Sequence, residues 1–205
     1  MNQRGLDEDG INHGVRELFA LVSEALAGAT DTLLAGDRDA AQRVVDRDEE
    51  IDGLTAELEQ AVWSRIDGHG AEGADLRRLV GVLHILPELE RSADLAEHIA
   101  QRGVSGLGSE MSPSSRGLVQ RMAEVALEMW RAVADAYDDW EVRSVPLDEA
   151  DEELDILHDR LTSEVAAGSM APSASAQVTL LARFYERLGD HAVNLARRIA
   201  TTVQS

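Results

Sequence analysis

The chain contains no cysteine and no lysine, and aromatic residues make up only 3% of its 205 residues. The absence of cysteine excludes a disulfide scaffold and any metal site built on thiolates. Basic residues are scarce as well, since 19 arginines stand against 39 acidic residues and the formal net charge is −20. A basic surface is what binds nucleic-acid phosphates, so this balance argues against nucleic acid as a partner. It also disfavours docking on an anionic membrane surface.

Long uncharged segments are equally scarce. The longest run without a charged residue, 165–182, contains glycine, proline and serines and does not predict a membrane-spanning helix. The first ten residues hold no apolar stretch, so no secretory signal is expected and a cytoplasmic location is predicted, without insertion into a membrane. Because 44% of the residues are hydrophobic, the chain can fold, and its length allows one or two domains.

The residues that are abundant, Ala, Leu, Glu and Arg, favour helix over strand. Clusters of Gly, Ser and Pro interrupt the helical pattern, and the pattern predicts six helices after frayed residues 1–10. The expected ranges are 12–35, 38–66, 74–102, 116–142, 147–167 and 174–202. Short connections between long amphipathic helices predict antiparallel neighbours, so the fold class is all-α, built from helical bundles.

The apolar positions of the first half recur in the second half. A shift of 103 residues matches the first two expected helices to the fourth and fifth, and a shift of 96 matches the third to the sixth. The matched pairs are Phe19–Met122, Val22–Val125, Leu26–Met129, Ile51–Leu154, Leu54–Leu157, Val82–Val178, Ile85–Leu181, Leu89–Tyr185 and Ile99–Leu195. We therefore predict two tandem, pseudo-repeated three-helix bundles, residues 1–105 and 106–205. Since any two amphipathic helices align partly on hydrophobicity, the polar positions carry more weight.

Four acidic pairs with the spacing i,i+4 lie at matching places in the two halves. The pairs are Asp48–Asp52, Glu90–Asp94, Asp151–Asp155 and Glu186–Asp190. Two of them belong to D-E-E-x-D sequences and two to E-R-x-x-D sequences, so the motifs repeat together with the helices. On a helix, residues four apart project from one patch. All four pairs fall at the edge of the apolar stripe, where antiparallel neighbours can bring two pairs together.

Four carboxylates on one patch repel one another, and a bound multivalent cation is the direct way to offset that repulsion. Oxygen ligands suit hard or intermediate ions, such as Mg, Mn, Fe or Zn. Arg91 and Arg187, beside the two glutamates, offer the alternative of neutralising the patch without metal. Further side chains within one turn of the acids could assist a metal ion. They are His98, His158, His191 and Asn194.

Two stretches resemble a known family. Residues 185–196, YERLGDHAVNLA, and residues 28–54, GATDTLLAGDRDAAQRVVDRDEEIDGL, resemble segments of the PhoU family of phosphate-signalling regulators. The resemblance covers nearly the whole chain after the first ten residues. It implies two three-helix bundles, each carrying two E/D-x-x-x-D motifs that hold metal ions at the surface. It also implies that the metal ligands are the eight acidic residues of the four pairs.

The same resemblance implies a non-enzymatic function. A protein of this kind would repress the phosphate-starvation response through contacts with the ATPase of a phosphate ABC transporter and with a sensor histidine kinase. The sequence leaves the oligomeric state open, with a homodimer as the expectation. The charge of −20 independently suits a basic surface on a protein partner. Two alternatives are a metal-free helical adaptor and a di-metal carboxylate enzyme of ferritin-like type. Such enzymes use Glu-x-x-His pairs in the bundle core, and this sequence has none.

Pro87 lies inside the third expected helix, where proline removes a backbone hydrogen bond and costs about 3 kcal/mol unless a kink accommodates it. Because Pro87 precedes Glu90 by three residues, metal binding is expected to suit the first bundle less than the second. The three tryptophans, Trp63, Trp130 and Trp140, are expected to be core or interface anchors.

Overall fold

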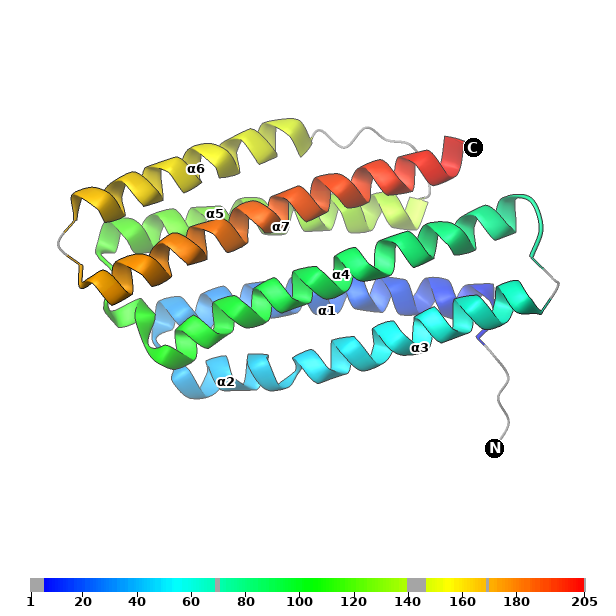
Figure 1. Cartoon of the computed structure of the whole chain (residues 1–205), viewed down its shortest axis with the longest axis horizontal. Coiled ribbons are helices and arrows are strands. Elements are labelled where there is room, and N and C mark those ends of the chain that lie inside the picture. The colour runs from blue at the N-terminus through cyan, green and yellow to red at the C-terminus, as the bar shows by residue number, and fades with distance from the viewer. Residues whose placement is uncertain (1–5, 69–70, 140–146, 169, 205) are drawn as a thin grey trace.

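A computed structural model describes residues 6–68, 71–139, 147–168 and 170–204 (Figure 1). Its elements are α1 (Glu8–Ala35), α2 (Arg38–Asp46), α3 (Asp48–Asp67), α4 (Ala74–Ser105), the 3-10 helix η1 (Leu107–Ser109), α5 (Pro113–Asp139), α6 (Leu147–Ala167) and α7 (Pro172–Gln204). No strand occurs in these ranges. The predicted all-α class is confirmed.

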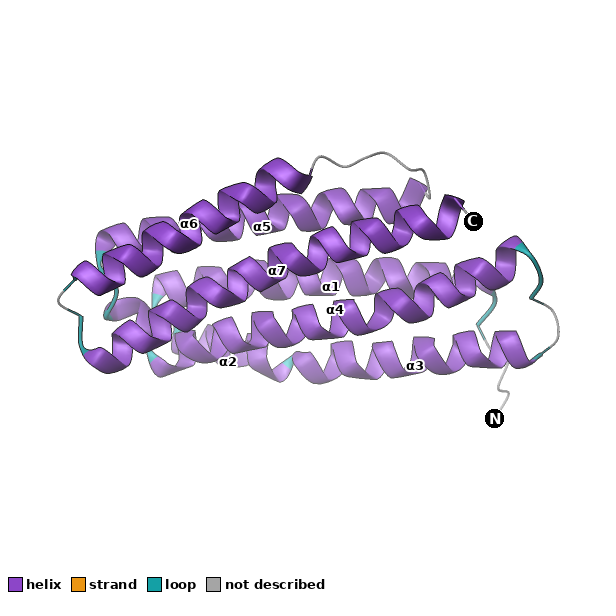
Figure 2. Ribbon diagram, turned by 45° about the horizontal axis from the view of Figure 1, so that its top comes forward, coloured by secondary structure: helices purple, strands orange, loops and turns teal. Residues whose placement is uncertain are grey.

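The long helices lie side by side along one axis and form two units (Figure 1). The first unit consists of α1, α2, α3 and α4, and the second of α5, α6 and α7. The units meet where α4 packs against α7 and α1 packs against α5. Both views show α4 and α7 adjacent, with α6 and the α2–α3 pair on the two outer sides (Figure 2). The predicted pair of tandem three-helix units is confirmed, except that the second helix of the first unit is divided.

That division falls within the expected helix 38–66. α2 ends and α3 begins at Arg47, whose backbone N–H donates to the carbonyl of Val44 at 3.2 Å. The residues that follow, Asp48 to Glu50, are all acidic, and acidic side chains are favoured in the first turn of a helix. The prediction of one continuous helix is therefore wrong, because the acidic run also acts as a signal for a new helix.

Capping residues set helix starts that hydrophobic periodicity places too late. The Asp7 side chain accepts a hydrogen bond from the amide of Gly10 at 2.9 Å, so α1 begins at residue 8 and not at 12. The Ser112 hydroxyl accepts from the amide of Ser115 at 3.0 Å, and Pro113 occupies the first position of α5. Residues 8–10 are therefore helical, and the expectation that they are frayed is wrong.

A carboxylate holds the start of α5 to the end of α6. Glu164 on α6 accepts hydrogen bonds from the hydroxyls of Ser112 at 2.6 Å, Ser114 at 2.5 Å and Ser115 at 2.9 Å. The hydrogen bonds from Ser112 and Ser114 are the main reason why the pKa of Glu164 lies below its ordinary value. The two helices are thus joined at this end by polar contacts as well as by the core.

The linker between the units is docked on the end of α1. Gly106 takes a left-handed φ of 84°, which favours glycine. The Arg116 side chain donates to the carbonyl of Gly108 at 2.6 Å and also donates to the carbonyl of Leu34. Arg116 therefore joins α5, the linker and α1.

α1 is long and apolar enough to cross a membrane, and it is the only such helix among the described residues. Its apolar stripe is buried against α3, α4 and α5, whereas Arg16, Glu17 and Glu24 are exposed. The composition of α1 is therefore accounted for by its place in the core.

One hydrophobic core runs through both units. At the α1–α5 contact, the Phe19 ring lies 6.2 Å from the Trp130 ring and 5.6 Å from the Tyr137 ring, centroid to centroid. Trp130 is fully buried, so it is an anchor as predicted. Trp63 is 50% exposed on α3, so it is not a core residue, and its role as an interface anchor stays a prediction. Trp140 lies outside the described residues.

The contact between α4 and α7 follows the internal repeat. With the shift of 96 residues, Glu88 corresponds to Phe184 and Arg102 corresponds to Arg198. Arg198 Nη2 lies 3.2 Å from Glu88 Oε1, and the Arg102 guanidinium lies 4.9 Å from the centre of the Phe184 ring. The two arginines occupy equivalent positions in the two halves, and each contacts the equivalent residue of the opposite helix. The contact of Arg198 is an ion pair, and the contact of Arg102 is a cation–π interaction.

Candidate functional site

The four acidic pairs form two groups, one in each unit. The first acidic group lies on α3 and α4 and consists of Asp48, Asp52, Glu90 and Asp94. The second acidic group lies on α6 and α7 and consists of Asp151, Asp155, Glu186 and Asp190. In both groups the two helices pack against each other, so two pairs from different helices share one region of the surface.

Within the first acidic group, Asp48 is the most perturbed carboxyl. Partial burial, followed by the charges of Asp52, Glu97, Asp94 and Glu90, raises its pKa to about 6. Burial followed by the charges of Asp52 and Asp94 also raises the pKa of Glu90. These effects require the carboxylates of α3 and α4 to lie within electrostatic reach of one another.

The second acidic group depends on a close approach of α6 and α7 at Gly189. A Cβ atom at Gly189 would lie 2.6 Å from Leu154 Cδ1 and 3.3 Å from Asp151 Oδ1. Burial, followed by the charges of Asp155 and Asp190, raises the pKa of Asp151. The small residue therefore lets carboxylates from the two helices approach and repel one another.

Glu186 has two different oxygens. Its Oε1 pairs with the guanidinium of Arg183, one turn earlier on α7. Its Oε2 is buried, has no hydrogen-bond partner among the described residues, and lies 3.9 Å from His158 Nε2. A buried carboxylate oxygen without a partner is costly, and a bound cation would satisfy it. In this respect the residues present fit a metal ion with oxygen ligands.

Within the described part of the chain, no three His, Asp or Glu side chains are arranged so that they could hold one metal ion. Metal binding would therefore require side chains to rotate toward one another. Asp155 and Asp190 are exposed and have room to do so, and their helix positions already lie on one patch.

Arginines neutralise the acidic groups only in part. Arg91 lowers the pKa of Glu90, but burial and two aspartates outweigh it, and Arg91 Nη1 also lies 3.6 Å from Glu88. In the second acidic group the arginine that pairs with Glu186 is Arg183, which the sequence analysis missed. Its signal was the i,i+3 spacing from Glu186.

The histidines near the motifs lie in different surroundings. His158 lies next to the second acidic group. His191 is buried, and its Nδ1 lies 2.5 Å from Glu88 Oε2. The His98 ring stacks on Phe184 with 5.5 Å between centroids. Of these three side chains, His158 is the one placed to assist a metal ion.

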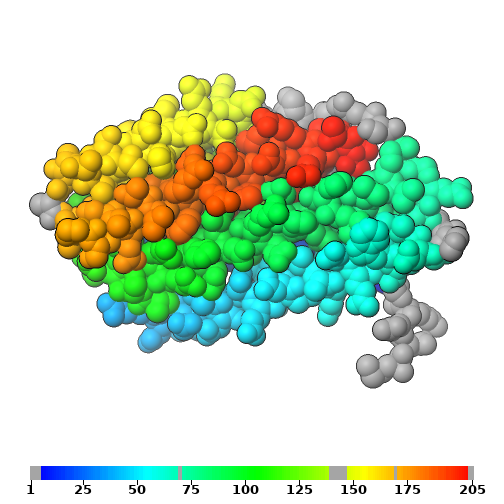
Figure 3. All heavy atoms as spheres, in the orientation of Figure 1, coloured from blue at the N-terminus to red at the C-terminus, as the bar shows by residue number. Residues whose placement is uncertain are grey.

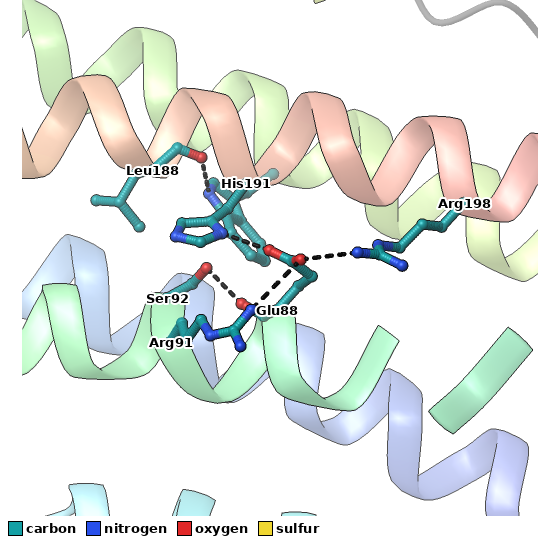
Figure 4. A network of polar contacts seen from close by, with 7 residues as sticks. Glu88, Arg91, Ser92, Leu188, His191 and Arg198 are labelled. Carbon is teal, nitrogen blue, oxygen red and sulfur yellow. Dashed lines mark hydrogen bonds and ion pairs between the residues drawn. The ribbon is translucent and has the colours of Figure 1, made fainter. Parts of the chain in front are cut away.

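A buried polar network connects α4 and α7 (Figure 4). Glu88 is only 5% exposed, and its carboxylate lies 3.2 Å from Arg198 Nη2, 3.6 Å from Arg91 Nη1 and 2.5 Å from His191 Nδ1. The Ser92 hydroxyl donates to the backbone carbonyl of Glu88 at 2.7 Å. Three cationic or titratable side chains thus share one carboxylate between the two units.

Asp48→Asn is expected to raise the free energy of unfolding by about 1 kcal/mol at about pH 7.5 in the presence of a chelator, and to have little effect near pH 4. The pKa of Asp48 is about 6 in the folded state against an ordinary 3.8, so ionised Asp48 destabilises the folded state. This destabilisation is complete above about pH 6 and absent below about pH 3.8. Solvent screens this partly exposed group, which keeps the gain small. Urea unfolding at both pH values measures it, with the exposed neighbour change Glu49→Gln as control. An equal gain at both pH values would contradict the argument.

A family model of the PhoU domain matches residues 15–103 and 119–199. The chain belongs to the PhoU family. One matched range lies in each unit, so α1–α4 and α5–α7 are the two PhoU domains.

Individual relatives agree with this membership. The phosphate-specific transport system accessory protein PhoU homolog of Zymomonas mobilis is 30% identical over 203 residues, which cover 96% of this chain and 85% of that protein. PhoU homolog 2 of Mycobacterium tuberculosis is 28% identical over 187 residues, 89% of this chain and 88% of that protein. The crystal structure of PhoU from Pseudomonas aeruginosa has a TM-score of 0.88 at 22% identity, covering 96% of both chains. That likeness shows a shared PhoU fold.

Proposed function

We propose that this PhoU-family chain is a cytoplasmic regulator of phosphate uptake and phosphate-starvation signalling that acts through protein contacts and not through catalysis. The observation that carries the proposal is the match of both units to the PhoU domain. Support also comes from the similarity to a phosphate-specific transport system accessory protein, which covers 96% of this chain and 85% of that protein. The proposed partners are the ATPase of a phosphate ABC transporter and a sensor histidine kinase, bound by a homodimer that represses the response.

Binding of the purified chain to the purified ATPase and to the cytoplasmic part of the kinase tests this proposal. We expect binding that weakens as salt is raised, because the net charge of −20 would meet a basic partner surface. An unrelated helical protein of similar negative charge serves as the control for non-specific attraction. Absence of binding to both partners at low salt would overturn the proposal. Tight binding to bare promoter DNA at physiological salt would also count against it.

We further propose that the second acidic group binds a divalent or trivalent cation such as Mg, Mn, Fe or Zn. Two observations support it: the raised pKa of Asp151, which reflects repulsion from Asp155 and Asp190 after burial, and the buried, unpartnered Oε2 of Glu186. All the ligands would be oxygens, with His158 able to assist. The cation would supply positive charge between α6 and α7. The first acidic group is the second candidate, because Pro87 does not interrupt the helix α4.

If the second acidic group binds metal, saturating metal is expected to raise the melting temperature of the wild-type chain by several degrees. A ligand that binds the folded state stabilises it by mass action. For a chain of this size, about 1 kcal/mol corresponds to roughly 2–4 °C. Asp155→Asn combined with Asp190→Asn is expected to abolish the rise while leaving the helix content unchanged. Thermal melts with and without chelator, together with elemental analysis, measure both effects.

The control is Glu149→Gln combined with Glu152→Gln, which removes the same charge from exposed positions of α6 and should keep the metal-dependent rise. If the wild-type chain purifies without metal and its melting temperature does not respond to Mg, Mn, Fe or Zn, the metal-free adaptor is the better interpretation. If metal persists in the Asp155–Asp190 double variant, the first acidic group binds it.

A further inference from the structure

The N-terminal half of α4 and the C-terminal part of α7 border a hollow of about 420 Å³, which we call the seam groove. These two segments meet on the right-hand side of the face in Figure 3. Leu76 and Val80 form its apolar floor, and Arg77, His84 and Arg198 contribute its basic side chains. No proposed metal ligand lines it.

The floor of the seam groove is exposed apolar surface. Leu76 is 37% exposed and Val80 is 40% exposed, and because they are four residues apart they form a strip one turn long on α4. The helices approach closely beside it, since a Cβ atom at Gly81 would lie 2.7 Å from Thr202 Cγ2. Large apolar side chains exposed together in a hollow are typical of an interaction site.

The charge of the seam groove is opposite to that of the chain. Residues 76–87 of α4 and 191–204 of α7 contain no acidic side chain, although the chain has 39 acids. Each of three other hollows is lined by at least two acidic residues. The seam groove therefore offers a local positive potential on a strongly negative protein.

Nearby carboxylates do not cancel this charge. Asp75 pairs with Arg65 at 3.5 Å, and Glu8 pairs with Arg78 at 3.2 Å. Both ion pairs leave Arg77 available at the edge of the seam groove. Arg198 shares the buried Glu88 with two other side chains, so that single carboxylate does not neutralise the region.

We infer that the seam groove docks an acidic amphipathic helix of a partner protein. Two apolar side chains one turn apart on that helix would cover Leu76 and Val80, and its flanking carboxylates would meet Arg77, His84 and Arg198. The inference rests on the proposed function only in taking the helix to belong to a phosphate-transport or signalling component.

A second copy of this chain is a poorer occupant. Two seam grooves facing each other across a two-fold axis would set the arginines of one copy against those of the other. A seam groove placed on a different surface of the next copy would make a contact that does not close and that leads to filaments. Either arrangement also brings together two chains of charge −20.

The first test uses a synthetic helical peptide with two leucines four residues apart and glutamates on both flanks. Fluorescence anisotropy should show binding that weakens with salt, and a scrambled peptide of the same composition should bind at least about tenfold more weakly. Arg77→Glu and Val80→Ser should each weaken binding by at least about tenfold. The matched controls Arg160→Glu and Ile156→Ser, in a hollow that also contains Asp159, should change it by less than about twofold.

The second test places the photo-crosslinking residue benzoylphenylalanine at position 80 or at position 156, with the purified ATPase and kinase as partners. Cross-linking of an acidic helix from position 80 alone supports the inference. If the partners bind but neither Arg77→Glu nor position 80 has any effect, the seam groove is not the docking site and the proposed function stands. If the peptide binds at the seam groove but neither partner binds the chain, the docking site stands and the proposed function fails.

Three outcomes overturn the docking site. The first is a failure of the peptide to bind the wild-type chain, or equal binding by the Arg77→Glu variant. The second is self-association in sedimentation that Arg77→Glu abolishes, which would make a second copy the occupant. The third is Arg77-dependent binding to phosphatidylglycerol vesicles without binding of the peptide, which would make a lipid surface the ligand.

Discussion

Glu88→Ala is expected to lower the free energy of unfolding by about 2–3 kcal/mol, because it removes the buried carboxylate that accepts hydrogen bonds from charged or titratable side chains of α7. Glu88 is 5% exposed and is the carboxylate that His191 and Arg198 of α7 share. Its loss would leave the buried imidazole of His191 and the guanidinium of Arg198, both on α7, without their carboxylate partner on α4. Urea unfolding followed by circular dichroism measures the effect.

The matched control is Glu57→Ala on α3, which removes the same side chain from an exposed position and should change the free energy of unfolding by less than about 0.5 kcal/mol. Equal effects of Glu57→Ala and Glu88→Ala would show that the network does not stabilise the fold. Glu88→Gln should cost less than Glu88→Ala, since the amide oxygen can still accept a hydrogen bond from Arg198.

Removing the whole network and removing only its carboxylate are expected to have different effects on the free energy of unfolding. Replacing Glu88, His191 and Arg198 together by leucine removes the charged and titratable side chains that meet between α4 and α7, and it leaves only the exposed Arg91 without its carboxylate partner. Well-packed apolar residues often replace a buried ion network at little cost, so this triple variant should be more stable than Glu88→Ala alone. A triple variant less stable than Glu88→Ala would mean that the three side chains do not act as one network.

Hydrophobic periodicity was sufficient to predict the helices and the two repeated units, because both depend on local spacing and on its recurrence. Helix ends were predicted less well, because single capping side chains decide them. Asp7 and Ser112 start their helices earlier than the apolar pattern does. The interruption at Arg47 was missed because an acidic run suits both a helix surface and a helix start.

The acidic motifs could be located from the sequence because i,i+4 spacing is local. The partners that a side chain contacts on another helix could not be predicted, since they depend on how α4 packs against α7. Glu88 is the example: it lies three residues after Ile85 and four before Ser92, both buried, and this places it on the buried face of α4. That pattern predicts a buried acid that needs a partner, but it does not say that His191 and Arg198 are the partners.

Gly108→Ala is expected to lower the free energy of unfolding by about 2–4 kcal/mol, because overpacking against backbone cannot be relieved by a change of rotamer. A Cβ atom at Gly108 would lie 1.9 Å from the carbonyl oxygen of Leu33 on α1. Either the linker or the end of α1 would have to move. That movement would disturb the hydrogen bond of 2.6 Å from Arg116 to the Gly108 carbonyl.

The matched control is Gly117→Ala on α5, where an added Cβ atom would meet nothing within 4 Å. This change should raise the free energy of unfolding by about 0.5–1 kcal/mol, since alanine is the better helix former. If urea unfolding shows that Gly108→Ala lowers the free energy of unfolding and Gly117→Ala raises it, the linker packs tightly on α1. If Gly108→Ala is neutral or stabilising, the linker moves freely, and the two PhoU domains are held together by the α1–α5 and α4–α7 contacts alone.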